Sequence, residues 1–92
     1  MDRAQIEVWV KTNLKLMPEQ HFSEEDIQHI VMCCDHLAQW DRGEGAGLGH
    51  FLTAVWENNF VRACTRADGV NRRALYLYAM FMLNHTSEGE KI

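Results

Sequence analysis

The sequence has few of the residues that interrupt helices. Its 92 residues include one proline, Pro18, and six glycines, three of which are Gly43, Gly45 and Gly47. Proline lacks the backbone N–H that a helix interior needs, and glycine loses the most conformational freedom when a helix forms. Their scarcity elsewhere argues against a loop-rich or collagen-like chain. It predicts long helical segments that end near Pro18 and between residues 43 and 47.

The cysteines are odd in number, and no long apolar run occurs. Cys33 and Cys34, two of the three cysteines, are adjacent on a predicted helix, so they would not pair with each other without distortion. We therefore expect free thiols and a reducing, cytoplasmic location. The longest apolar run, 74–83, is much shorter than the roughly 20 residues that a membrane span needs. Asp2 and Arg3 interrupt any signal-like start, so we expect no secretion signal and no membrane partner.

Positive charge is in deficit. Nine Lys and Arg side chains stand against thirteen Asp and Glu side chains, which gives a formal net charge of −4. A protein that binds nucleic acid needs a basic footprint, so we do not expect nucleic acid as the main partner. The hydrophobic share of 47% and the charged share of 24% are typical of a folded globular chain. The length predicts one domain.

Apolar residues recur at three- and four-residue steps in four segments, which is the pattern of amphipathic helices. The second segment has the clearest start, because Ser23 is followed three residues later by Asp26, an acidic variant of the capping box. We predict an all-α, compact four-helix domain with short loops over residues 1–85, followed by a flexible polar tail at 86–92. The four helices run from about Arg3 to Met17, from Ser23 to the glycines, from about Leu48 to Ala63 and from about Val70 to Asn84.

The last two predicted helices differ in character. The third has one apolar face that includes Phe60, and Asn59 interrupts it, so we expect this amide to tie the helix to a turn or to another helix. The fourth is apolar around its whole circumference from 74 to 83, so more than one side must be covered. It is either a central core helix or a helix that also forms an interface. The second interpretation predicts a homo-oligomer that buries Tyr76, Met80 and Leu83.

The second helix carries a further group of residues opposite its core stripe. At 100° per residue, His29, Cys33, His36 and Trp40 share this face. Their spacing resembles a zinc site, but no paired-cysteine motif is present, and we predict neither a metal nor another cofactor. A tryptophan outside the core is typical of binding hot spots, so Trp40, His36 and Cys33 are predicted to bind a partner. The alternative is that the first helix or the glycine loop covers this face.

Four arginines cluster where the third and fourth predicted helices meet: Arg62, Arg66, Arg72 and Arg73. Three interpretations remain open. The arginines can form structural ion pairs, for example between Arg66 and Asp68. They can bind an acidic partner, such as the acidic helix start at residues 24–26 of a second copy. They can also bind a nucleotide or nucleic acid.

Nothing in the sequence indicates catalysis. The glycine-rich stretch at 43–47 has neither the preceding strand nor the following lysine of a phosphate-binding loop. No Ser-His-Asp or Cys-His arrangement stands out, and Cys33 near His29 or His36 implies no pocket by itself. We therefore predict a protein that is not an enzyme.

One stretch of the chain resembles a known group of proteins. From residue 49 it reads GHFLTAVWENNFVRACTRADGVNRRAL. This stretch is similar to small uncharacterised helical proteins of bacteriophages and prophages, which share the pattern FLxAVxxN followed by AxxRADxxNxxAL. The matching residues are Phe51, Leu52, Ala54, Val55, Asn58, Ala63, Arg66, Ala67, Asp68, Asn71, Ala74 and Leu75. The resemblance covers only the C-terminal half of the chain.

The resemblance implies a phage-encoded accessory factor in the host cell cytoplasm. Small phage proteins of this kind often bind a host or phage macromolecule, and some inhibit a bacterial defence system such as CRISPR. We therefore predict a protein that acts by stoichiometric binding to another protein, of the host or of the phage. The alternative is a nucleotide or nucleic-acid binding protein that uses the arginine corner.

Overall fold

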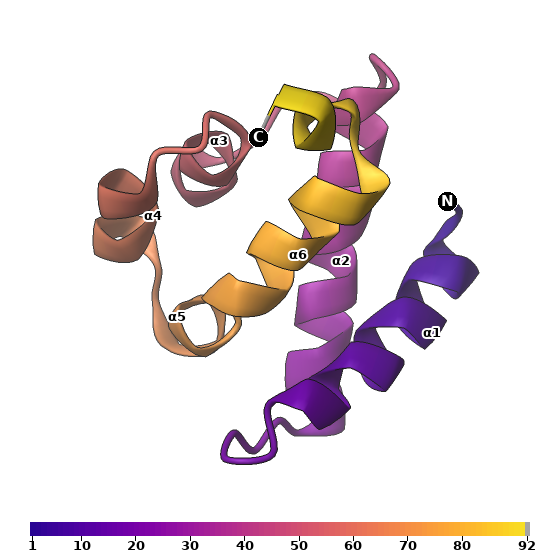
Figure 1. The fold of residues 1–92 in the computed structure, drawn as a ribbon, viewed down its shortest axis with the longest axis vertical. Coiled ribbons are helices and arrows are strands. Elements are labelled where there is room, and N and C mark those ends of the chain that lie inside the picture. The colour runs from indigo at the N-terminus through magenta and orange to yellow at the C-terminus, as the bar shows by residue number, and fades with distance from the viewer. Residues whose placement is uncertain (92) are drawn as a thin grey trace.

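The computed structural model describes residues 1–91, and Figure 1 shows that they fold as helices joined by turns and loops. The predicted all-α class is confirmed, since no strand occurs in this range. The predicted count of four helices is wrong, because these residues form six α-helices and two short 3-10 helices. The α-helices are α1 (Arg3–Asn13), α2 (Glu24–Asp41), α3 (His50–Trp56), α4 (Phe60–Arg66), α5 (Gly69–Arg73) and α6 (Leu75–His85), and the 3-10 helices are η1 (Leu14–Leu16) and η2 (Ser87–Lys91).

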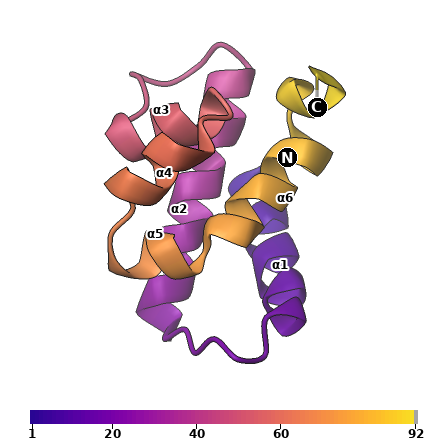
Figure 2. The ribbon, with the colours of Figure 1, turned by 60° about the vertical axis from the view of Figure 1, so that its left-hand side comes forward.

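The first two helices begin at side-chain caps. Asp2 and Gln5 form a reciprocal capping box at the start of α1, and Ser23 and Asp26 form the predicted one at the start of α2. The helices α1 and α2 then run side by side in opposite directions (Figures 1 and 2). Caps of this kind satisfy backbone N–H groups that a helix start leaves unpaired. The sequence pattern predicted the box at Ser23, whereas the box at Asp2 was not predicted.

The core lies where α1 and α6 meet α2. Its largest fully buried side chains come from these three helices, and Tyr78 and Phe81 of α6 are completely enclosed. Trp9 of α1 packs edge to face on Phe81, with 5.4 Å between ring centroids, and thereby joins α1 to α6. The radius of gyration is 12.2 Å, close to the roughly 12 Å expected for a compact chain of this length.

The third predicted helix is broken into α3 and α4. Asn58 has a φ of 57°, in the left-handed region that stops a right-handed helix and that asparagine tolerates better than most residues. The side-chain oxygen of Asn59 then accepts a 3.0 Å hydrogen bond from the backbone N–H of Arg62. Asn59 therefore caps the start of α4 and does not lie inside a continuous helix.

The fourth predicted helix is broken at Ala74, where φ is −102° and ψ is 8°. Asp68 occupies the N-cap position of α5 but makes no side-chain capping bond. Arg73 in the last turn of α5 donates a 2.6 Å hydrogen bond to the carbonyl of His21, which ties this short helix to the loop before α2. α6 leaves this anchored turn in a different direction (Figure 2).

The residues after α6 form a short helix of their own. The polar segment predicted as a flexible tail at 86–92 contains η2, which lies beside α6. Thr86 donates a 2.8 Å hydrogen bond to the carbonyl of Met82, and Asp41 accepts one of 3.1 Å from the backbone N–H of Ser87. These contacts fasten the segment to α6 and to the end of α2. Ile92, the last residue of the predicted tail, lies outside the described residues.

The break between α3 and α4 depends on Asn59, which gives a stability prediction. Replacing Asn59 with Ala removes the cap of α4 and should lower the free energy of unfolding by about 1 kcal/mol. Urea unfolding followed by circular dichroism measures this change. Asn58→Gly is the matched control, because glycine adopts a positive φ without strain and should leave stability equal or slightly higher. An unchanged midpoint for Asn59→Ala would contradict the assigned cap.

Candidate functional site

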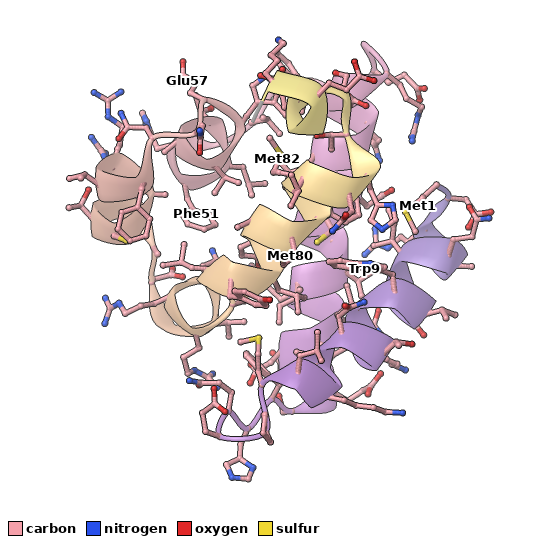
Figure 3. The ribbon with its side chains drawn as sticks, in the orientation of Figure 1. Met1, Trp9, Phe51, Glu57, Met80 and Met82 are labelled. Atoms are coloured by element: carbon pink, nitrogen blue, oxygen red, sulfur yellow. The ribbon has the colours of Figure 1, made fainter. Side chains whose placement is uncertain are left out.

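An apolar groove of about 570 Å³ lies between α3–α4 and α6–η2. Glu57, just after α3, and Met82 of α6 come from its two sides (Figure 3). Buried Tyr78 contributes to the groove, and Phe51 packs edge to face on its ring with 5.6 Å between ring centroids. The other lining residues are Ala54, Val55, Trp56, Asn58, Asn59, Phe60, Ala63, Leu75, Tyr76, Ala79, Glu88 and Lys91.

Two aromatic side chains lining this groove are largely exposed. Phe60 begins α4 and is 73% exposed, and Tyr76 in the first turn of α6 is 53% exposed. The sequence pattern assigned Phe60 to the apolar face of the third helix, and this assignment is wrong. The reason is the turn at Asn58 and Asn59, which gives α4 a direction of its own, so its side chains no longer continue the stripe of α3.

The predicted oligomer interface lies partly on the surface. Tyr76 and Leu83, at 53% and 44% exposure, are open to solvent, whereas Met80 is half-buried. Of the three, only Tyr76 lines the groove. The opposite side of α6 supplies core residues such as Leu77 and Phe81. The single copy therefore leaves part of the apolar surface of α6 uncovered, and contact with a second copy stays a prediction.

The three residues of the predicted partner face on α2 do not share one exposed surface. Trp40 is 42% exposed and His36 is also exposed, but only 4% of Cys33 is accessible. The placement of Cys33 on an open face is therefore wrong, because α5 and α6 pack on that side of α2 and cover it. The Sγ of Cys33 lies 3.6 Å from the Nε2 of His29.

A polar cluster fills this junction of three helices. The Tyr78 hydroxyl of α6 donates a 2.7 Å hydrogen bond to the Oδ1 of Asn71 in α5, and the Nε2 of His29 in α2 lies 3.1 Å from the same oxygen. Periodicity within one helix did not predict that Asn71 would contact these residues. Within residues 1–91 no three His, Cys, Asp or Glu side chains are placed to hold a metal ion together. We interpret the cluster as structural, because it satisfies buried polar groups and joins α2, α5 and α6.

Burial also determines the chemistry of the thiols. It raises the pKa of Cys33 and, more strongly, that of Cys34, because the thiolate would lose its hydration inside the protein. Both groups therefore stay protonated at neutral pH, and a protonated thiol is a poor nucleophile and a poor metal ligand. Cys64 in α4 is only half-buried.

The structure divides the predicted arginine corner. Arg73 is a structural residue, since its Nη2 lies 3.5 Å from a carboxylate oxygen of Asp26 and its guanidinium stacks 4.9 Å from the centre of the Phe22 ring. The ion pair engages Asp26, one of the acids at residues 24–26 that we expected to bind the arginines of a second copy. Arg72 lies 3.4 Å from the carbonyl of Ala67.

Arg62 and Arg66 form a separate site. They line a smaller pocket of about 290 Å³ together with Leu48, Gly49, His50 and Thr53. The expected ion pair between Arg66 and Asp68 is not formed, because no Arg66 nitrogen lies within 4.0 Å of that carboxylate. His50 and Thr53 lie three residues apart in α3, and Arg62 and Arg66 lie four residues apart in α4. Residues at these spacings share a helix face, and this spacing was the signal for the pocket in the sequence.

The buried thiols give a prediction for chemical labelling. In the native protein, we expect Ellman's reagent to modify Cys64 quickly and to modify Cys33 and Cys34 at least about tenfold more slowly, because both are buried and protonated. Absorbance at the thionitrobenzoate band follows the reaction. Cys64→Ser should abolish the fast phase, and Cys33→Ser should leave it unchanged. A fast phase that survives in Cys64→Ser would contradict the assignment.

The polar cluster gives a second stability prediction. Asn71→Ala leaves the buried Tyr78 hydroxyl without its acceptor, so the free energy of unfolding should fall by about 1–3 kcal/mol. Tyr78→Phe removes the donor and keeps the ring, so it should cost about 1 kcal/mol or less. Urea denaturation of the two variants and the wild type measures both values. Equal losses, or a larger loss for Tyr78→Phe, would show that Asn71 is not the centre of the cluster.

The comparisons with known proteins suggest no function, so the geometry of the two hollows is the basis for assigning one. The chain matches no protein-family model, no curated protein and no solved structure at a significant level. No helix in the part of the chain that the structure describes is long and apolar enough to cross a membrane. Function therefore has to be inferred from the apolar groove and from the arginine pocket.

Proposed function

We propose that the protein is not an enzyme and acts by stoichiometric binding to another protein, with the groove between α3–α4 and α6 as the contact surface. The observation that supports this most directly is the exposure of Phe60 and Tyr76 along an apolar groove. Exposed aromatic side chains that surround a concave surface are more typical of interaction sites than of the rest of a protein surface. A partner that fills the groove would remove both rings from water.

The proposed occupant is an amphipathic helix of the partner protein. The groove lies between helical segments and is lined mainly by apolar side chains, which suits the apolar side of such a helix. Two acids line it. Glu88 pairs with Lys91 within η2, whereas Glu57 lies within 4.0 Å of no Lys, Arg or His nitrogen of residues 1–91. A basic residue beside the apolar side of the partner helix would therefore complement Glu57.

The similarity of residues 49–75 to small phage proteins extends this proposal. On this basis the protein is a phage-encoded accessory factor in the host cytoplasm. The partner is then a host or phage protein, and a component of a bacterial defence system such as CRISPR is the first candidate. Inhibition by stoichiometric binding requires a contact surface but no catalytic group.

The alternative of nucleotide or nucleic-acid binding at the arginine corner receives less support. Arg73 is held by Asp26 and the carbonyl of His21, so it is not free to bind a phosphate group. A net charge of −4 adds repulsion of a polyanion at low ionic strength. Arg72 lies 3.4 Å from the carbonyl of Ala67. This leaves Arg62 and Arg66, and two arginines make a small footprint for nucleic acid.

The test starts with capture of a partner from host lysate, followed by titration calorimetry with the purified partner. We expect one partner molecule per protein and an affinity at least about thirtyfold weaker for the Phe60→Ala/Tyr76→Ala double variant, because central aromatic side chains dominate binding energy. Val8→Ala/Leu16→Ala is the matched control, since it removes two exposed apolar side chains that do not line the groove.

Three outcomes would overturn the proposal. The first is equal loss of affinity in the control, and the second is unchanged affinity in the Phe60→Ala/Tyr76→Ala variant. The third comes from light scattering, which reports the mass in solution against the 10.7 kDa of one chain. A dimer that the Phe60→Ala/Tyr76→Ala variant dissociates would show that a second copy, not a partner helix, occupies the groove.

A further inference from the structure

The second hollow of the molecule contains an unusual concentration of positive charge. The pocket between α3 and α4 measures about 290 Å³, and its lining residues include Arg62, Arg66 and His50. The two arginines lie one turn apart on α4, and His50 begins α3. The sequence pattern grouped the arginines with Arg72 and Arg73, whereas the structure groups them with His50.

These two arginines differ from most of the other long cations of the chain. Arg3, Arg42 and Arg73 each lie within 4.0 Å of a carboxylate, as do Lys11 and Lys91. Among the described residues, no carboxylate oxygen lies within 4.0 Å of the guanidinium nitrogens of Arg62 or Arg66. These two groups also donate no side-chain hydrogen bond to the described residues. In a chain with thirteen acids and nine Lys and Arg residues, this pocket therefore keeps its positive charge uncompensated.

The pocket has the donors that an oxyanion needs. A guanidinium presents planar pairs of N–H groups that match the two oxygens of a carboxylate. Like charges one helical turn apart repel each other, and a bound anion would remove that repulsion. The hydroxyl of Thr53 already donates to the carbonyl of Leu48 at 3.2 Å, so the arginines and His50 have to supply the donors.

From these unpaired arginines we infer that the pocket lined by His50, Arg62 and Arg66 binds the carboxylates of an acidic peptide segment. The pocket is too small to follow a nucleic-acid backbone. One or two carboxylate side chains fit the volume of the pocket, and the two guanidinium groups provide charged donors for them. This site is separate from the proposed groove, because the two hollows have no lining residue in common.

Nuclear magnetic resonance of the intact protein labelled with nitrogen-15 tests this inference. The probes are a hexaglutamate peptide, a hexathymidylate oligonucleotide and inorganic phosphate, each titrated in the same low-salt buffer. Hexaglutamate should shift the amide signals of His50, Thr53, Arg62 and Arg66 saturably. In Arg62→Ala/Arg66→Ala its affinity should fall at least about tenfold, because the charged donors are lost. Because hexaglutamate has no apolar side chains, this readout does not depend on the groove.

Lys11→Ala/Lys15→Ala is the matched control. It lowers the net charge by the same amount at α1 and η1, and it should keep hexaglutamate affinity within about twofold of the wild type. Thermal unfolding confirms that both double variants are folded. The inference is overturned if the control weakens binding as much, or if the shifts do not saturate. It is also overturned if hexathymidylate or phosphate binds as tightly as hexaglutamate.

Discussion

The burial of α6 against α2 is the interaction on which the remaining structure depends. Tyr78 and Phe81 are completely enclosed at this contact, and Trp9 adds α1 to it through the Phe81 ring. The Tyr78 hydroxyl cannot be buried without an acceptor, and Asn71 supplies one from α5. The same carboxamide oxygen lies next to His29 of α2. Apolar burial and one satisfied polar group therefore fix three helices in relation to each other.

The breaks in the chain create the two candidate sites. If residues 48–63 formed one helix, their apolar residues would share a single face, as the sequence pattern suggests. The left-handed turn at Asn58 and the cap at Asn59 instead start a second helix beside the first. One side of the resulting α3–α4 pair faces α6 and encloses the apolar groove. A separate set of α3 and α4 residues forms the pocket with Arg62 and Arg66. Two polar residues, Asn58 and Asn59, thus place core-like sequence along the lining of the two candidate sites.

The distribution of ion pairs separates structural charge from available charge. Arg73 lies between the carboxylate of Asp26 and the Phe22 ring, and its hydrogen bond to the carbonyl of His21 anchors α5 to the start of α2. Arg62 and Arg66 have no such contacts, although all three arginines lie within twelve residues of one another. Buried or anchored arginines stabilise a fold, whereas unpaired ones lining a pocket are suited to binding an anion.

The sequence by itself determined what depends on neighbours along the chain. Helical periodicity established the all-α class, and the Ser23–Asp26 capping box located the start of α2, because both signals act within one or two turns. Tertiary structure decided which apolar and charged residues face solvent. Cys33 is buried because α5 and α6 cover that side of α2, and Phe60 is exposed because α4 has its own direction. A residue's exposure depends on elements far away in the sequence, and periodicity within one helix contains no information about them.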